Sequence, residues 1–211
     1  MNRKKAEKRF ADGPGTKKEL EVLNVASDYF LAHGFQGTSI NAMARDSGIS
    51  KESIYRYFSS KKDLFEAVIA KELAEYQDKL HSGDIEFKSV PLEVALIRMA
   101  EPILGVVPTD RTLGLRRLIF QETTKYPDIG KYYYDIGPRE AYRNLEKLFA
   151  IHKDRLTLSP QKLSRYFMSM LLHYRMLLRE CGVLKPLSKS QVRTAAKEVT
   201  RDFINAFVDE T

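Results

Sequence analysis

The stretch SGISKESIYRYFSSKKDLF, residues 47–65, decides how the N-terminal part of this chain folds. Ser50 precedes a short apolar repeat, and its hydroxyl is placed to accept the backbone N–H of Ser53 as the N-cap of a helix. Residues four apart lie on one helix face, so Ile54 and Phe58 point together into a core. The stretch therefore predicts a short helix with one buried side.

The opposite side of this helix carries polar and aromatic residues. Arg56 faces outward with Glu52 and Ser53 beside it, while Tyr55 and Tyr57 fall at the border between core and solvent. That distribution suits a helix in a DNA major groove, where the outward face meets base edges and the flanking hydroxyls reach phosphates. The other interpretation is a helical hairpin whose amphipathic tyrosines only cover its core. The spacing alone leaves both open.

Two helices are expected before this stretch. The first spans about 17–33 and ends at Gly34, a residue that can adopt the left-handed conformation of a helix terminus. A short second helix follows Thr38 and Ser39 and ends at Gly48. With the tight turn after it, the second helix forms a helix-turn-helix in which the next helix reads the groove.

The whole chain is predicted to be all-α, because strand patterns are nearly absent while apolar residues recur every three or four positions. A long fourth helix begins after Ser59 and Ser60 and links two halves. Further helices are expected at about 91–105, 111–126, 129–150, 160–181 and 189–208. Gly137-Pro138 should break or kink the third of these.

Three segments are expected along the chain. Residues 1–16 form a flexible basic arm, 17–80 a helix-turn-helix domain and 90–211 a helical C-terminal domain. The polar segment HSGDIEFKS, residues 81–89, is the expected boundary because turn residues replace the periodicity before Pro91. The arm either touches phosphates or a minor groove on DNA or is a solvated tail.

The charge of the chain is unevenly distributed. Its 211 residues carry a net charge of +7, from 35 basic and 28 acidic side chains. Residues 1–62 hold 12 basic and 7 acidic residues, a net charge of +5. A surface that binds a polyanion is therefore expected in the N-terminal part.

Catalytic and metal chemistry is not indicated. Cys181 is the only cysteine, which excludes an internal disulfide and a thiolate metal cluster. The histidines lie at positions without ligand spacing: His33, His81, His152 and His173. We expect no enzyme, no cofactor and no metal. No apolar run approaches the roughly 20 residues of a membrane span, so a soluble cytoplasmic protein without a membrane partner is expected.

The segment AHGFQGTSINAMARDSGISKESIYRYFSSKKDLF, residues 32–65, resembles the DNA-binding domain of the TetR/AcrR family of bacterial transcriptional regulators. The resemblance covers about residues 17–75. The features that carry the resemblance are a helix that ends in Gly-Phe, a Thr-Ser pair before the next helix, and the motifs Ala-x-x-Ser-Gly-Ile-Ser, Ser-Ile-Tyr-x-Tyr-Phe and Ser-Lys-x-x-Leu. All of them occur at the spacing of the family.

The resemblance implies a set of DNA contacts. The residues that it implies for phosphates are Thr38, Lys51, Ser53, Tyr55, Tyr57 and Lys61. Those nearest base edges are Asn41, Lys51, Glu52 and Arg56, and Ser39 completes the DNA-binding set. The family often has a small residue at the position of Glu52, whose carboxylate either accepts from a cytosine amino group or pairs with Arg56 one turn later.

The segment RRLIFQETTKYPDIGKYYYDIGPREAYRNLEKLF, residues 116–149, is similar to the C-terminal domain of the AefR-like branch of the same family. This likeness implies a domain that binds a small-molecule effector and forms a homodimer through the last two helices. Candidate ligand-binding residues are Met99, Glu122, Tyr133, Met170 and His173. Candidate interface residues are Phe167, Tyr174, Ala195, Ala196, Val199, Phe203 and Phe207.

Both candidate sets have a structural alternative. A buried carboxylate such as Glu122 usually has a hydrogen-bond partner, His173 has the same two interpretations, and tyrosines such as Tyr133 often only pack. The apolar stripes of the last two helices can close the core of one chain or a dimer interface.

Two functions are compatible with these features. The first is a sequence-specific DNA-binding regulator, a repressor that leaves a palindromic operator when an unknown small effector binds its C-terminal domain. The second is a DNA-binding protein of the same fold with a structural or protein-partner role and no small effector.

Overall fold

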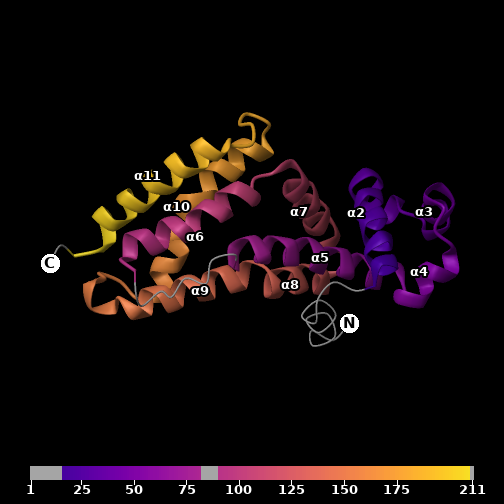
Figure 1. Cartoon of the computed structure of the whole chain (residues 1–211), viewed down its shortest axis with the longest axis horizontal. Coiled ribbons are helices and arrows are strands. Elements are labelled where there is room, and N and C mark those ends of the chain that lie inside the picture. The colour runs from indigo at the N-terminus through magenta and orange to yellow at the C-terminus, as the bar shows by residue number, and fades with distance from the viewer. Residues whose placement is uncertain (1–15, 82–89, 210–211) are drawn as a thin grey trace. The chain divides into compact units, whose positions relative to one another are not determined.

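Helices and their connections make up the part of the chain that the computed structural model describes, residues 16–81 and 90–209, with only the backbone described at 75–81. The elements in Figure 1 are α2 (Lys17–Gly37), α3 (Ile40–Ser47), α4 (Lys51–Tyr57), α5 (Lys61–His81), α6 (Leu92–Val106), α7 (Asp110–Thr123), α8 (Pro127–Ile136), α9 (Pro138–Ile151), η1 (Lys153–Arg155), α10 (Pro160–Glu180) and α11 (Lys189–Phe207). The only extended pairing within those residues is an isolated bridge between Leu156 and Val208. The prediction of an all-α fold is confirmed.

Three of the breaks predicted from glycine and proline occur in the structure, while α7 ends at Thr123, before the expected residue 126. Gly34 has a φ of 70° and interrupts the helical backbone of α2, and Gly48 has a φ of 70° as the C-cap of α3. A side chain would strain the backbone at both positions. Gly137 separates α8 from α9, and Pro138 is the first residue of α9, where its missing N–H costs no hydrogen bond. Residues 1–15 of the expected basic arm, 1–16, lie outside the described residues, and Thr16 is the N-cap of α2.

The chain divides into two compact units, each built from two segments. Unit 1 contains the residues up to Gln77 together with Gly114–Ile136, and unit 2 contains Asp78–Leu113 together with the residues from Gly137 onward. This division differs from the expected division into 17–80 and 90–211. The last part of α7 and all of α8 belong with the N-terminal helices, and the expected boundary at 82–89 lies outside the described residues.

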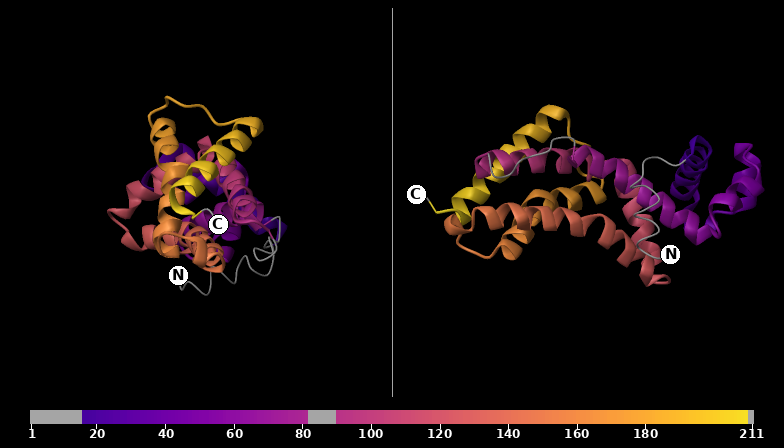
Figure 2. Two further views of the ribbon diagram at one scale, coloured as in Figure 1. Left: turned by 90° about the vertical axis from the view of Figure 1, so that its left-hand side faces the viewer. Right: turned by 60° about the horizontal axis from the view of Figure 1, so that its bottom comes forward.

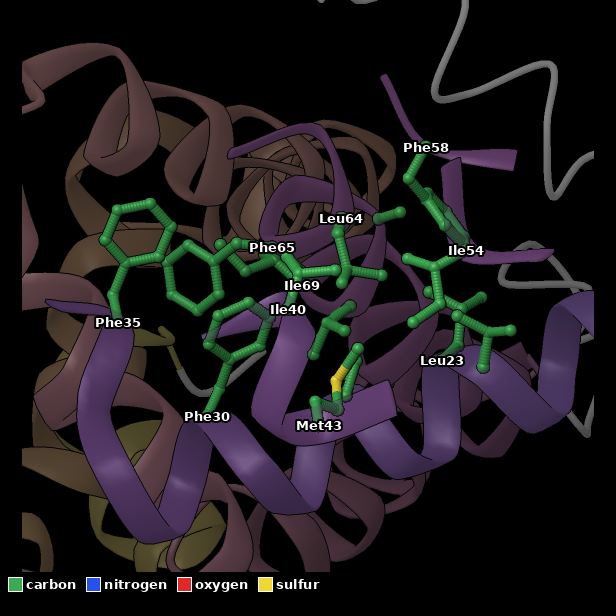
Figure 3. Packing of buried hydrophobic residues seen from close by; sticks show 14 of the residues in the cluster. Leu23, Phe30, Phe35, Ile40, Met43, Ile54, Phe58, Leu64, Phe65 and Ile69 are labelled. Carbon is green, nitrogen blue, oxygen red and sulfur yellow. The ribbon is translucent and has the colours of Figure 1, made fainter. Parts of the chain in front are cut away.

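The core of unit 1 is built around three aromatic rings, shown in Figure 3. The ring centroid of Phe65 lies 4.9 Å from that of Phe30 and 5.1 Å from that of Phe35. Ile54 and Phe58 are also fully buried, which confirms the inward face predicted for α4. Burial of each such side chain contributes about 1.5–3 kcal/mol, so this core fixes the three helices of the helix-turn-helix unit.

The core of unit 2 is formed by helices on both sides of α10. Helix α6 packs on α11, α9 packs on α10, and α10 and α11 lie side by side (Figure 2). Phe203 of α11 is fully buried, with its ring centroid 5.1 Å from Phe167 and 5.4 Å from Phe149. Phe167 and Phe203, from the last two helices, therefore close the core of a single chain.

This packing corrects part of the expected dimer interface. Phe167, Ala195, Ala196 and Phe203 are buried in unit 2, so they have almost no surface for a second subunit and are reassigned to the core. Val199 and Phe207 are half-buried beside them. Tyr174 is the exposed member of the set, with 67% of its surface accessible. Periodicity identified the stripes but not the surface that covers them.

Candidate nucleic-acid interface

The two helices of the helix-turn-helix begin at serine caps. Ser50 Oγ accepts the backbone N–H of Ser53 at 3.1 Å, which confirms the predicted start of α4. Ser39 Oγ accepts the backbone N–H of Ala42 at 3.4 Å. Ala42 has no side-chain oxygen to return a bond, so α3 lacks a reciprocal capping box. Each cap satisfies backbone donors that would otherwise face solvent at the proposed DNA surface.

The turn between α3 and α4 is held from both sides. Ser47 Oγ donates to the carbonyl of Met43 at 2.7 Å, Gly48 reverses the chain, and Ile49 is buried after it. Met43 is itself fully buried in the unit 1 core. The angle between the two helices is thereby fixed by packing, as a reading helix requires.

The outward face of α4 carries exposed residues of mixed charge. Lys51, Glu52, Tyr55 and Arg56 are all exposed, and Tyr55 has 46% of its surface accessible. Lys51 Nζ lies 5.8 Å from the centroid of the Tyr55 ring. Ser53 is half-buried, and its hydroxyl lies 2.8 Å from Ser50 Oγ. Asn41, on α3, is also exposed.

Arg56 lies against its neighbour Tyr57 and does not pair with Glu52 among the described residues. Its Nη2 donates to the Tyr57 hydroxyl at 3.0 Å, and its Cζ lies 4.9 Å from the ring centroid. Thr16 Oγ1 donates to the same hydroxyl at 3.2 Å. The hydrogen bond from Thr16 and then that from Arg56 hold the pKa of Tyr57 below its ordinary value. Of the two roles expected for Glu52, the ion pair with Arg56 is therefore absent from the described residues, and the contact with a cytosine amino group stays a prediction.

Helix α3 is attached to α2 by a polar contact at the surface. The Tyr29 hydroxyl donates to the Asp46 carboxylate, and Arg45 Nε donates to Asp46 Oδ1 at 2.9 Å. The Tyr29 hydrogen bond, followed by that of Arg45, lowers the pKa of Asp46. The same bond to Asp46 raises the pKa of Tyr29. This contact holds the C-terminal end of α3 in place.

Two expected phosphate contacts have other partners in the free protein. Thr38 is 2% exposed, and its hydroxyl donates to the carbonyl of Gly34 at 2.7 Å, so we reassign its side chain to the end of α2. Lys61 Nζ donates to the carbonyl of Thr38 at 2.9 Å and lies 4.8 Å from the Phe35 ring centroid. Sequence reasoning missed this role of Lys61, although a cation near a helix C-terminus is favourable.

The five candidate ligand-binding residues are divided between the two units. Glu122 and Tyr133 lie in unit 1, where burial raises the pKa of Tyr133. Met99, Met170 and His173 lie in unit 2; Met99 is half-buried beside its core, and the other two are exposed. Glu122 is 4% exposed and accepts a hydrogen bond from Gln36 Nε2 at 3.0 Å.

Polar links outside the helix-turn-helix were not predicted. In unit 1, Lys62 of α5 forms an ion pair with Asp128 of α8. In unit 2, the buried Arg179 donates to the carbonyl of Pro108 at 2.8 Å and to Asp110 at 2.5 Å. All of these partners are more than 60 residues apart in sequence, so no local pattern could indicate them.

The described residues show neither a metal-binding cluster nor a membrane-spanning helix. They contain no group of three or more His, Cys, Asp or Glu side chains that could hold a metal ion. None of the helices in residues 16–81 and 90–209 is long and apolar enough to span a membrane.

Two family models match this chain. Residues 22–68 match the family described as "Bacterial regulatory proteins, tetR family", and residues 94–208 match "AefR-like transcriptional repressor, C-terminal domain". The second match alone covers more than half of the 211 residues. The two matches contain the helix-turn-helix and the helices of unit 2.

Curated relatives match over shorter segments. The uncharacterized HTH-type transcriptional regulator YfiR of Bacillus subtilis is 34% identical over 64 residues, which cover 30% of this chain and 31% of that protein. The HTH-type transcriptional activator FasR of Mycolicibacterium smegmatis is 31% identical over 87 residues, or 38% of each chain. The matched segments therefore span about a third of the length of these relatives.

Solved structures share the fold over most of the chain. A TetR-family transcriptional regulator from Mesorhizobium loti has a TM-score of 0.78 at 23% identity, with 92% of this chain and 98% of that chain covered. The flavonoid-responsive regulator FrrA has a TM-score of 0.76 at 24% identity, with 93% and 100% covered. At these identities the likeness concerns the fold.

Proposed function

The chain belongs to the TetR family of bacterial DNA-binding transcriptional regulators, and we propose that it is a sequence-specific repressor released from its operator by a small-molecule effector. The description of the matched C-terminal family names a transcriptional repressor, whereas FasR is an activator. The direction of regulation is therefore part of the proposal. A DNA operator as partner implies action in the cytoplasm.

The observation that carries the proposal is the geometry of α4. One side of this helix is buried through Ile54 and Phe58, while Lys51 and Arg56 stand exposed on the other side. A helix fixed to a rigid core with cations on its outer face can enter a major groove and offer guanidinium donors to guanine. We assign base contacts to Arg56 and Lys51, with Asn41 and Glu52 beside them.

Phosphate contacts are assigned to hydroxyl and amino groups around this face. The assigned residues are Ser39, Lys51, Ser53, Tyr55, Tyr57 and Lys61. Thr38 is left out because its side chain is buried. Lys61 would have to exchange its bond to the Thr38 carbonyl for a phosphate, which is a stronger acceptor for a cation.

A second copy is needed to read a palindrome, because two half-sites lie about one helical turn, roughly 34 Å, apart. We propose that dimerisation uses the outer face of α10. Its exposed apolar residues follow one helical stripe: Tyr166, Met170, Tyr174 and Leu177. The opposite side of α10 is buried through residues such as Leu163 and Leu171, so this stripe is an exposed apolar face, of which only the Tyr166 ring contacts another aromatic ring in the described residues, that of Phe207 at 5.5 Å.

Effector control would use the continuity of α7. This helix begins in unit 2, where Arg179 holds its first residue Asp110, and ends in unit 1, where Glu122 bonds to Gln36. A ligand that prefers one arrangement of unit 2 can bias the other end of the same helix. Met99, Met170 and His173, all in unit 2, are the proposed ligand contacts. Glu122 and Tyr133 keep their structural alternative in unit 1, where Glu122 accepts from Gln36 and Tyr133 packs on the core.

The test is selection of binding sites from random duplex DNA by the purified full-length chain. The proposal expects enrichment of a symmetric sequence with half-sites about 10 base pairs apart. Compounds that raise the melting temperature of the protein are then tested for release of that DNA. Absence of any enriched sequence would overturn sequence-specific binding, and binding that no stabilising compound alters would favour the role without an effector.

A further inference from the structure

We propose that Tyr57 is a positioning residue for sequence readout: its ring and hydroxyl hold the Arg56 guanidinium in the orientation that reads a base. The inference rests on the proposed function, because it assumes that Arg56 meets a base edge. It adds a second role to Tyr57, which has so far been assigned only a phosphate contact.

The relation between the two side chains is unusual for adjacent residues on a helix. Neighbouring positions are separated by about 100° around the helix axis, so their side chains normally diverge. Arg56 instead bends over Tyr57, with one hydrogen bond of 3.0 Å to the hydroxyl and its Cζ 4.9 Å from the ring centroid. Two contacts with one side chain restrict both the direction and the rotation of the guanidinium plane.

Tyr57 is itself fixed to unit 1. Its ring is half-buried, packs against the hydrophobic core and lies 6.3 Å from the ring of Phe58. Its hydroxyl accepts a hydrogen bond from Thr16, whose Oγ1 also accepts the backbone N–H of Glu19 as the N-cap of α2. The orientation of Arg56 is therefore tied through Tyr57 to the first residues of the domain.

A restrained arginine has a physical advantage in base recognition. Bidentate recognition of guanine requires the plane of the guanidinium to match the O6 and N7 acceptors. An arginine that is already ordered loses less conformational freedom when it binds, so its affinity for the matching base is greater. A purely phosphate-binding tyrosine would instead add affinity without regard to sequence.

Tyr55 is a matched control on the same helix. It also stands beside a cation, but Lys51 Nζ is 5.8 Å from its ring centroid, and no hydrogen bond joins the two side chains among the described residues. Tyr55→Phe therefore removes a phenol hydroxyl from the same surface without touching Arg56.

The experiment is a double-mutant cycle with full-length protein on the selected operator and on operators with single base changes. Wild type, Tyr57→Phe, Arg56→Ala and the double variant are compared, with Tyr55→Phe as control. Arg56→Ala should reduce discrimination at one base position by about 5- to 150-fold. Tyr57→Phe should reduce discrimination at that same position by about 2- to 10-fold, and it should do so only while Arg56 is present.

A second measurement reads the positioning without DNA. The order parameter of the Arg56 side chain, measured by nitrogen relaxation on the free protein, should fall in Tyr57→Phe and stay unchanged in Tyr55→Phe. A merely structural role of Tyr57 would not change this local order in a variant with wild-type circular dichroism.

Two outcomes overturn the inference, and they are distinguishable. If Arg56→Ala leaves base preference unchanged, the groove assignment of α4 in the proposed function fails together with the inference. If Arg56→Ala relaxes base preference but Tyr57→Phe weakens binding to all DNA equally, with or without Arg56, only the positioning role of Tyr57 fails.

Discussion

The side-chain amide of Gln36 donates a hydrogen bond to the buried carboxylate of Glu122 at 3.0 Å and so joins the end of α2 to α7. The two residues are 86 positions apart in sequence and belong to the same compact unit. Helix α3 packs on α2, and α4 packs on α3. The contact therefore connects α7 with the helices proposed to read DNA.

Removal of this acceptor should destabilise unit 1. Glu122→Ala leaves the Gln36 amide without this partner and opens a space in a buried position, which should cost about 1.5–3 kcal/mol of unfolding free energy. Glu122→Gln keeps a carbonyl oxygen and serves as the matched control, with a smaller loss. Urea unfolding at one pH measures both. Equal stability of Glu122→Ala and wild type would show that this contact does not hold α7.

The Tyr29–Asp46 contact makes stability depend on pH in acid. The folded-state pKa of Asp46 lies below its ordinary value of about 3.9, so its contribution is present above that pH and is lost as the pH falls through the folded pKa. The melting temperature of wild type should exceed that of Asp46→Asn at neutral pH, and the difference should shrink below about pH 4. A difference that is constant over this range would contradict the assignment.

The Tyr29–Asp46 pair also predicts that stability is lost in alkali, as the pH rises. The pKa of Tyr29 is raised above its ordinary value of about 10 by its bond to Asp46. Its contribution is therefore complete below pH 10 and is lost as the pH rises through the folded pKa. Ultraviolet titration should show one tyrosine that ionises at lower pH in Asp46→Asn than in wild type. An identical titration in both proteins would contradict the contact.

Substitution of Arg179 should destabilise the protein more than substitution of its acidic partner Asp110. Its guanidinium donates to the carbonyls of Pro108 and Leu184 and to Asp110, but the side chain of Asp110 is 85% exposed. Arg179→Lys cannot reach all three acceptors and should cost about 2–4 kcal/mol. Asp110→Asn should cost less than about 1 kcal/mol, because an exposed ion pair is screened by water. Chemical denaturation of both variants measures their losses of unfolding free energy. A larger loss in Asp110→Asn than in Arg179→Lys would contradict the prediction.

Tyr174 and Phe203 should respond differently to substitution by glutamate, because only Tyr174 lies on the proposed dimer interface. Tyr174→Glu places a charge on the exposed stripe of α10 and should raise the dimer dissociation constant by at least about 30-fold, as expected for a residue at the centre of an interface. Phe203→Glu should unfold unit 2 instead, because Phe203 is completely buried. Val183→Glu, at an exposed position beyond α10, is the control. Sedimentation equilibrium checks this prediction, and a folded dimeric Tyr174→Glu would place the interface elsewhere.

The elements of the fold could be predicted because their signals are local. The Ser50 cap, the left-handed glycines Gly34 and Gly48, and the break at Gly137-Pro138 each depend on residues within one or two turns. The sequence placed Arg56 on the exposed side of α4 for the same reason. These local rules were sufficient for the helix-turn-helix.

Contacts between distant residues could not be predicted from the sequence. Periodicity marked Phe203 as one of a stripe but could not show that Phe149 and Phe167 cover it. The backbone carbonyl that accepts the hydrogen bond of Lys61 belongs to Thr38, 23 residues earlier, and only the folded end of α2 brings the two together. The bend of Arg56 onto Tyr57 was missed because helical geometry alone separates neighbouring side chains.

Protection of guanine N7 from methylation in the selected operator tests the central claim most directly, because N7 lies in the major groove, where α4 is proposed to bind. Wild-type protein should protect guanines symmetrically in both half-sites, and Arg56→Ala should restore reactivity at one guanine in each half-site while neighbouring positions stay protected. Uniform reactivity at every guanine N7 in the wild-type complex, or identical protection by wild type and Arg56→Ala, would contradict base reading by Arg56.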